Sequence, residues 1–136
     1  MIEIRRAKEE DLEEIVELEN KVWPPGTRSP REKFESRLKI FPQGFFLAYN
    51  ENSLIGVSTS QIINYDGSSI DSWENITDFG WIRKTHNPGG NALYIVSIPR
   101  TLGNISKGFI TINKTGGVIY INSKPSFFSN KNACQN

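Results

Sequence analysis

The sequence has few of the residues on which several kinds of protein depend. Cys134 is the only cysteine among 136 residues, so an internal disulfide is excluded and a reducing compartment fits. His86 is the only histidine, and with a single cysteine the chain lacks the cluster that a zinc site needs, so we expect no metal. Sixteen basic residues nearly balance 15 acidic ones, for a net charge of +1. This balance gives no attraction to a polyanion, and we expect no nucleic-acid partner.

Long hydrophobic runs are also missing. The densest run, residues 44–49, is far shorter than a membrane-spanning helix requires. The first six residues alternate like a strand and contain no apolar core of a signal peptide. We therefore expect no membrane association and a cytoplasmic location.

The hydrophobic residues that are present suffice for one packed core. They make up 37% of the chain, and aromatic residues make up 11%. A chain of this length and composition is typical of a single domain. We predict one domain over residues 1–122, followed by a polar tail over residues 123–136.

The first 42 residues predict a strand and two helices. Alternation over residues 2–5 predicts a half-buried strand with Ile2 and Ile4 on its inner side. Apolar residues at helical spacing predict a helix from residue 12 to about residue 22. A second helix is predicted from a capping box, in which Ser29 caps, Pro30 opens the helix and Glu32 reaches back. Its apolar stripe consists of Phe34, Leu38 and Phe41.

A hairpin and a long loop are predicted next. Residues 44–49 and 54–63 have strand character, and the polar residues 50–53 between them form a turn. Gly56 inside the second strand indicates a bulge or a close approach of backbones. Residues 64–90 form a long irregular region, which in a compact domain is usually functional or mobile.

The chain is organised around the short apolar run 91–98. This run predicts a central strand buried on both faces. The segment 99–108 that follows it opens with Arg100 and contains two glycines. Free backbone N–H groups after a central strand are suited to holding a phosphate. Further on, residues 109–113 and 118–122 have strand propensity around a turn, and local rules favour a hairpin, although a helix at 109–113 stays open.

The order of these segments resembles the GNAT superfamily of acyl-CoA-dependent N-acetyltransferases. Residues 2–7 and 9–12 look like a GNAT first strand and helix. Residues 45–49 and 54–57 look like its second and third strands, and residues 86–94 look like the start of its fourth strand. The resemblance extends to about Ile98. It implies an α+β fold with a GNAT-like mixed sheet and two N-terminal helices.

The resemblance also implies a chemistry. GNAT proteins bind acetyl-CoA beside the fourth strand and transfer its acetyl group directly to an amine. Backbone N–H groups of that strand polarise the thioester carbonyl, and a loop of the form Gln/Arg-x-x-Gly-x-Gly/Ala holds the diphosphate. The residues of this chain that match these cofactor-binding positions are Val96, Ser97, Ile98, Arg100, Gly103, Asn104 and Ser106.

Candidates for proton transfer are few. Glu74 and Asp78 lie in the long loop, where a carboxylate suits a cationic amine or a general base. Tyr94 lies on the fourth strand, one face of which lines the acyl channel if the resemblance holds. His86 is either a proton carrier or, more simply, a residue that hydrogen-bonds its own turn. The acceptor would be the amine of a small molecule or a protein, delivered through residues 64–90.

The C-terminal part departs from the family. Ile105 stands where a Gly or Ala lets the backbone approach the diphosphate. All 15 acidic residues precede Pro99, and the remaining helix and strands of a GNAT domain are not recognisable. Two hypotheses follow. The chain is an acetyltransferase with acetyl-CoA as co-substrate, or it is a truncated or frameshifted remnant that binds no CoA and is inert or serves as an interaction module.

Overall fold

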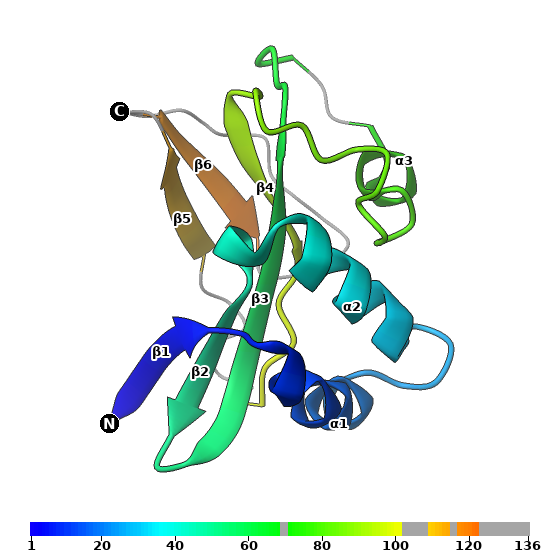
Figure 1. Ribbon diagram of the computed structural model, residues 1–136. Coiled ribbons are helices and arrows are strands. Elements are labelled where there is room, and N and C mark those ends of the chain that lie inside the picture. The colour runs from blue at the N-terminus through cyan, green and yellow to red at the C-terminus, as the bar shows by residue number, and fades with distance from the viewer. Residues whose placement is uncertain (69–70, 102–108, 115–116, 123–136) are drawn as a thin grey trace.

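The computed structural model describes residues 1–68, 71–101, 109–114 and 117–122 (Figure 1). Two short 3-10 turns, Glu9–Asp11 and Pro42–Gly44, accompany the helices and strands. In chain order these are β1 (Ile2–Arg6), α1 (Leu12–Val22), α2 (Arg31–Ile40), β2 (Phe46–Asn50), β3 (Ser53–Ile63), α3 (Trp73–Thr77), β4 (Ala92–Ser97), β5 (Phe109–Lys114) and β6 (Gly117–Asn122). The α+β class and the two N-terminal helices are as predicted.

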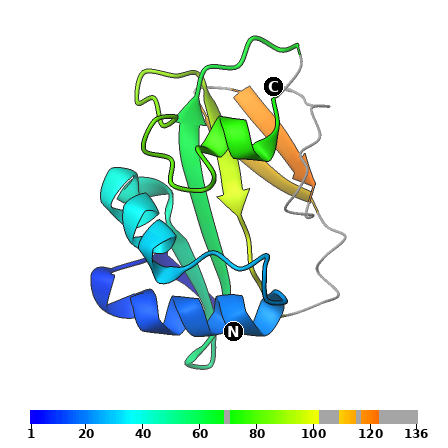
Figure 2. The same cartoon turned by 90° about the vertical axis from the view of Figure 1, so that its right-hand side faces the viewer.

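The strands form two sheets. The larger has the order β1-β2-β3-β4, and the smaller is the hairpin β5-β6. All pairings among the described strands are antiparallel. Helices α1 and α2 cover one face of the larger sheet (Figure 2). β4 was predicted to be central, but it is the outermost strand of the larger sheet, because the strands that follow it pair with each other.

The helices pack through the apolar stripes that the sequence predicts. Leu12, Ile15 and Leu18 of α1 and Phe34 of α2 are buried against the sheet. The predicted capping box of α2 is wrong. Pro30 occupies the cap position, and no side chain caps the helix. Ser29 instead donates its N–H to Glu19 at 2.7 Å and accepts a hydrogen bond from Arg37, because these buried charged groups need partners.

The core lies between α1, α2 and the sheet. Its members are Ala7, Leu12, Ile15, Leu18, Phe34, Phe45, Leu47 and Val57. The inward orientation predicted for Ile2 and Ile4 is wrong, since these side chains are 49% and 60% exposed. Arg5 and its ion-pair partner Asp11 take the helix side of β1, which leaves the two isoleucines on the opposite face.

The hairpin β2–β3 has the predicted turn. Glu51 and Asn52 both have positive φ, 53° and 73°, as a tight two-residue hairpin turn requires. The predicted bulge is present, since Ala48 pairs with Gly56 while Tyr49 pairs with Leu54. A Cβ on Gly56 would be 3.7 Å from its nearest neighbour, an ordinary contact. Gly56 is therefore located at the bulge, and a Cβ at this position would meet no steric clash.

The segment between β3 and β4 is more ordered than predicted. It contains α3, whose cap Ser72 accepts a hydrogen bond from the N–H of Asn75. At its end, Gly90 lies so close to β3 that a Cβ there would collide with the carbonyl oxygen of Ile63. The end of the segment is therefore fitted closely against β3.

The hairpin interpretation of residues 109–122 is confirmed, because Phe109 to Lys114 pair in register with Asn122 to Gly117. Residues 109–113 are thus a strand. The predicted polar tail, residues 123–136, lies outside the described residues. Across the described ranges, no helix combines the length and the apolar composition needed to cross a membrane.

Candidate functional site

The candidate site lies along β4, which is irregular at its centre. Ser60 pairs with Ile95 and Thr59 pairs with Ser97, so Val96 is an extra residue that forms a bulge. The carbonyl oxygen of Val96 accepts a hydrogen bond from the indole Nε1 of Trp73, at 2.9 Å. Trp73 opens α3, so this bond ties the segment before β4 to the bulge.

Beyond the bulge, the chain continues to pair with β3. The N–H of Val57 bonds to the oxygen of Pro99 at 3.0 Å, and the N–H of Thr101 bonds to the oxygen of Ile55 at 2.9 Å. Gly56 and Arg100 lie opposite each other between these two hydrogen bonds. Two residues in such a position of an antiparallel sheet do not bond to each other, and their N–H groups point away from the partner strand. The N–H groups of Ile98 and Arg100 therefore face the outer edge of the sheet.

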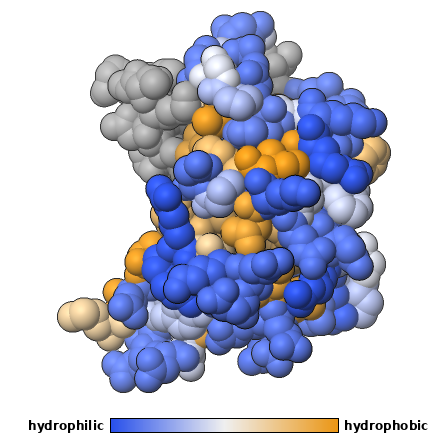
Figure 3. All heavy atoms as spheres, viewed as in Figure 1, coloured by the Kyte–Doolittle hydropathy of each residue, from blue (hydrophilic) through white to orange (hydrophobic). Residues whose placement is uncertain are grey.

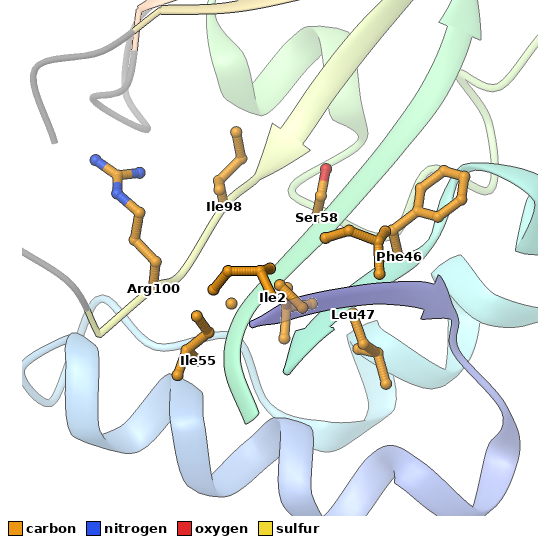
Figure 4. Close-up of a pocket in the computed structure, with 11 residues that line it drawn as sticks. Ile2, Phe46, Leu47, Ile55, Ser58, Ile98 and Arg100 are labelled. Carbon is orange, nitrogen blue, oxygen red and sulfur yellow. The ribbon is translucent and has the colours of Figure 1, made fainter. Parts of the chain in front are cut away.

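Arg100 adds a cationic side chain beside these donors. Burial lowers the pKa of its guanidinium. Its Nε is buried, and no hydrogen-bond partner for it occurs among the described residues. Figure 4 shows its side chain on the same stretch of backbone as Ile98. Two outward N–H groups and a guanidinium are a donor set suited to an anion.

Ser97 points to the helix side, where it meets a buried polar cluster. Its Oγ lies 3.1 Å from Thr59 Oγ1 and accepts a hydrogen bond from Arg37 Nη1 at 3.2 Å. Arg37 is 1% exposed and also donates to the oxygen of Gly80 at 2.7 Å. Burial lowers its pKa to about 10, against the opposing effect of Glu19. The guanidinium thus joins α2, β3, β4 and the loop after α3.

Sequence reasoning missed Arg37 and Trp73. A signal for Arg37 exists, because it shares the apolar stripe of α2 with Phe34 and Leu38, where a charged residue needs an internal partner. No local pattern indicates that Trp73 bonds to Val96, since 23 residues separate them.

Tyr94 and Glu74 are brought together. Tyr94 is 4% exposed and packs with Ile63 and Ala92. Burial raises the pKa of its hydroxyl, and the carboxylate of Glu74 on α3 raises it further. Tyr94 therefore stays protonated near neutral pH. About four strand residues, or about 13 Å, separate it from Ile98 along β4.

Asp78 stands apart from this pair. It ends α3 in the left-handed conformation, with φ of 57°. Its Oδ2 is buried and has no hydrogen-bond partner among the described residues. Burial and the charge of Arg37 lower the pKa of Lys33, whereas Asp78 raises it. Asp78 thus faces the cationic side of α2.

His86 has a structural position. Its Nδ1 accepts the N–H of Ile62 on β3 at 3.1 Å, and its ring lies 4.6 Å from that of Phe41. Burial lowers the pKa of its imidazole. The histidine thus bonds the neighbouring strand, not its own turn.

The remaining candidates from the glycine segment, Gly103, Asn104 and Ser106, lie outside the described residues. The described ranges contain no group of three or more His, Cys, Asp or Glu side chains arranged to hold a metal ion. The site is therefore the β4 edge from the Val96 bulge to Arg100, with Tyr94, Glu74 and Asp78 to one side.

The chain is similar in sequence to two proteins of Bacillus subtilis strain 168. It is 35% identical to "Probable hydrolase YhcX" over 96 residues, which are 70% of this chain and 18% of that protein. It is 34% identical to "Uncharacterized N-acetyltransferase YkwB" over 100 residues, 70% of this chain and 44% of that protein. The chain thus spans less than half of either relative. No protein-family model matches it.

Two solved structures share the fold. The loading GNATL domain of CurA from Lyngbya majuscula superimposes with a TM-score of 0.60 and 20% identity, over 77% of this chain and 50% of that chain. The GphF GNAT-like decarboxylase in complex with isobutyryl-CoA gives a TM-score of 0.60 and 23% identity, over 74% and 49%. The chain thus shares its fold with GNAT-like domains, as the resemblance of its sequence predicted.

Proposed function

We propose that this chain is an acyl-CoA-dependent N-acyltransferase that uses acetyl-CoA and transfers the acetyl group to an amine of a small molecule or a protein. One observation carries the proposal. The Val96 bulge and the pairing of Pro99 and Thr101 with β3 direct the N–H groups of Ile98 and Arg100 outward from the β4 edge. The name of YkwB supports acetyl transfer, and the isobutyryl-CoA complex of GphF supports a CoA thioester.

The donors at the β4 edge suit part of CoA. Hydrogen bonds to an anion or a polarised carbonyl are available from the outward N–H groups of Ile98 and Arg100 and from the Nε of Arg100, which has no partner within the described ranges. The N–H of Thr101 is already donated to Ile55. Acetyl-CoA, when bound, supplies the activated acyl group. Val96, Ser97 and Ile98 would lie along the acyl portion, and Arg100, with Gly103, Asn104 and Ser106 after it, would hold the diphosphate.

The proton transfers would involve the residues beside β4. An attacking amine must lose one proton as its nitrogen bonds to the acyl carbon, and the carboxylates of Glu74 and Asp78 are the candidate acceptors. Tyr94 is the candidate donor of a proton to the departing sulfur. The acceptor would approach along residues 64–90, and the reaction would take place in the cytoplasm.

Calorimetry tests the binding step. Acetyl-CoA is titrated into the full chain, and thermal unfolding is followed at the same concentrations. We expect a shift of the melting temperature, because a ligand that binds the folded state raises its stability. Arg100→Gln should weaken binding, whereas the exposed Arg83→Gln should leave it unchanged. The absence of any shift at millimolar acetyl-CoA would exclude the proposal.

A second candidate function has its own support. Ile105 departs from the small residue of the family's loop, and Thr101 uses its N–H within the sheet. These features favour a domain that has lost CoA binding and acts through its surface. This candidate predicts no acetyl-CoA binding by a chain that unfolds cooperatively, so the same titration decides between the two.

A further inference from the structure

The face of the large sheet opposite α1 and α2 is apolar and open. We call it the open sheet face and define it by eight residues that line one groove of about 280 Å³ (Figure 4). Its members are Ile2, Ile4, Phe46, Ala48, Ile55, Ser58, Ile98 and Arg100. Three of the large side chains are well exposed, namely Ile2 at 49%, Ile4 at 60% and Phe46 at 37%. Figure 3 shows hydrophobic residues at the surface among hydrophilic ones.

Strand alternation explains why these residues share a face. Leu47 and Val57 belong to the helix-side core, so their neighbours Phe46, Ala48 and Ser58 point the other way. The same alternation puts Ser97 with Arg37 on the helix side and Ile98 on the open side. The sheet is thus apolar on both faces, as is typical of a sheet covered on both sides.

The described helices do not cover this face. α1 and α2 lie across the opposite face, and α3 is tied to β4 through Trp73. A contiguous group of exposed apolar side chains is a candidate interaction surface.

The width and the charge of the open sheet face indicate which kind of partner fits it. The lining residues come from β1, β2, β3 and the extension of β4, which at ordinary strand spacing is about 14 Å across. A helix with its side chains is about 10 to 12 Å wide, so one helix covers most of this width. Arg100 is the only charged lining residue, and its Nε is buried without a partner among the described residues. A carboxylate on the helix would satisfy it.

We infer that the open sheet face docks an amphipathic helix of another polypeptide, with an apolar stripe over Ile4 and Phe46 and an Asp or Glu against Arg100. A second copy of this chain is a poorer occupant, because the apolar stripe of its α1 is already buried in its own core. The inference rests on the fold alone, although Ile98 and Arg100 also belong to the proposed acetyl-CoA site.

A related protein supplies the probe. The chain matches YkwB over 44% of that protein, so more than half of YkwB lies outside the match. A relative that shares this sheet must cover the same face with residues from its remaining length. The part of YkwB outside the match should therefore contain a complementary helix. In intact YkwB that helix should already be packed against the sheet of the same protein, so it should not bind this chain.

The experiment is fragment complementation. The full chain is co-expressed with the non-matching part of YkwB, and affinity is measured by calorimetry and stoichiometry by ultracentrifugation. We expect a 1:1 complex with the fragment and none with intact YkwB. Isoleucine methyl NMR gives the location: Ile4 and Ile55 signals should shift, while those of the core residues Ile15 and Ile82 should not.

Variants identify the contact. Ile4→Asp and Phe46→Asp should each weaken binding at least tenfold. Phe79→Asp, at an exposed hydrophobic residue outside the groove, should not. Arg100→Glu should also weaken binding, because it would place a carboxylate against the Asp or Glu of the helix. The inference is overturned if the folded chain forms no complex, or if the Ile4 and Phe46 variants bind the fragment as tightly as the wild type does. It is also overturned if the chain instead associates with itself through these residues.

Discussion

At the scale of single residues, His86 shows how one ring can stabilise a sheet. It accepts the N–H of Ile62 while Asn87 donates its N–H to the oxygen of the same residue. Together they complete the hydrogen bonding of Ile62 beside the segment that leads into β4. The bond requires an unprotonated Nδ1, and burial lowers the pKa of the ring. The neutral imidazole is thus part of the folded state.

This predicts a pH dependence of stability. Because the folded pKa of His86 lies below its unfolded value, its contribution is fully present above about pH 6.5 and is lost as pH falls through the folded pKa. His86→Asn keeps an acceptor but cannot titrate. The difference in unfolding free energy between wild type and variant, from urea denaturation at pH 5 to 8, should shrink toward acid pH. A difference independent of pH would contradict this role.

Arg37 carries a second prediction at this scale. Its guanidinium donates to Gly80, Ser97 and Ser29, so Arg37→Met would leave several buried acceptors unpaired. It would also remove the positive charge near buried Glu19, whose Oε1 has no hydrogen-bond partner among the described residues. We expect a loss of about 3 kcal/mol in the free energy of unfolding.

Arg31 in the same helix is the matched control. It is exposed, and of the residues that the structure describes it pairs only with Glu35 along the helix, so Arg31→Met should cost less than about 0.5 kcal/mol. Chemical denaturation of both variants measures the difference. Equal losses would show that Arg37 adds nothing beyond the general effect of removing a helix charge.

At the scale of elements, the β2–β3 turn offers a stabilising substitution. Asn52 has φ of 73°, a conformation that glycine adopts without strain. Asn52→Gly gives the turn the residue preferred at its second central position, and we expect a gain of up to about 1 kcal/mol. Asn50→Gly, within β2, should instead destabilise the fold. Thermal unfolding that ranks the two variants in the opposite order would refute the turn assignment.

Local chemistry explains which elements were predictable. The helix from Leu12 to Val22 and the turn at Glu51 and Asn52 follow from spacing and residue type within a few positions. The orientation of β1 does not, because Ile2 and Arg5 differ in burial only through distant partners such as Asp11 and Tyr49. Likewise, Ser29 resembles a helix cap, but a buried Glu19 ten residues away takes its N–H.

The candidate site was predictable only in outline. The short apolar run 91–98 indicated the strand that contains Val96 and Ser97, and the GNAT resemblance indicated that its backbone matters. The bulge depends on how Thr59 and Ser60 pair with that strand. The return of Arg100 to Gly56 is a contact between residues 44 positions apart. Such register is a property of the assembled sheet, and no local pattern specifies it.

At the scale of the whole molecule, β3 joins two packed regions, because its Val57 belongs to one and its Ile63 to the other. One is the core between α1, α2 and the sheet, and the other gathers Ile63, Ala92 and Tyr94 with the flanking Tyr65, Trp73 and Ile76. The described members of both clusters all precede Pro99. The pairing of Pro99 and Thr101 with β3 then adds two backbone hydrogen bonds at the far end of the sheet.

The last prediction follows from this distribution. A chain that ends after Thr101 keeps the described members of both clusters and both hydrogen bonds, so we expect it to unfold cooperatively in urea. A chain that ends after Ile98 loses the bonds from Val57 to Pro99 and from Thr101 to Ile55, and should be less stable by about 1 to 2 kcal/mol. If the chain ending at Thr101 lacks a cooperative transition while the full chain has one, the residues after it are essential to the fold. Equal stability of the two shortened chains would show that the extension of β4 does not hold in solution.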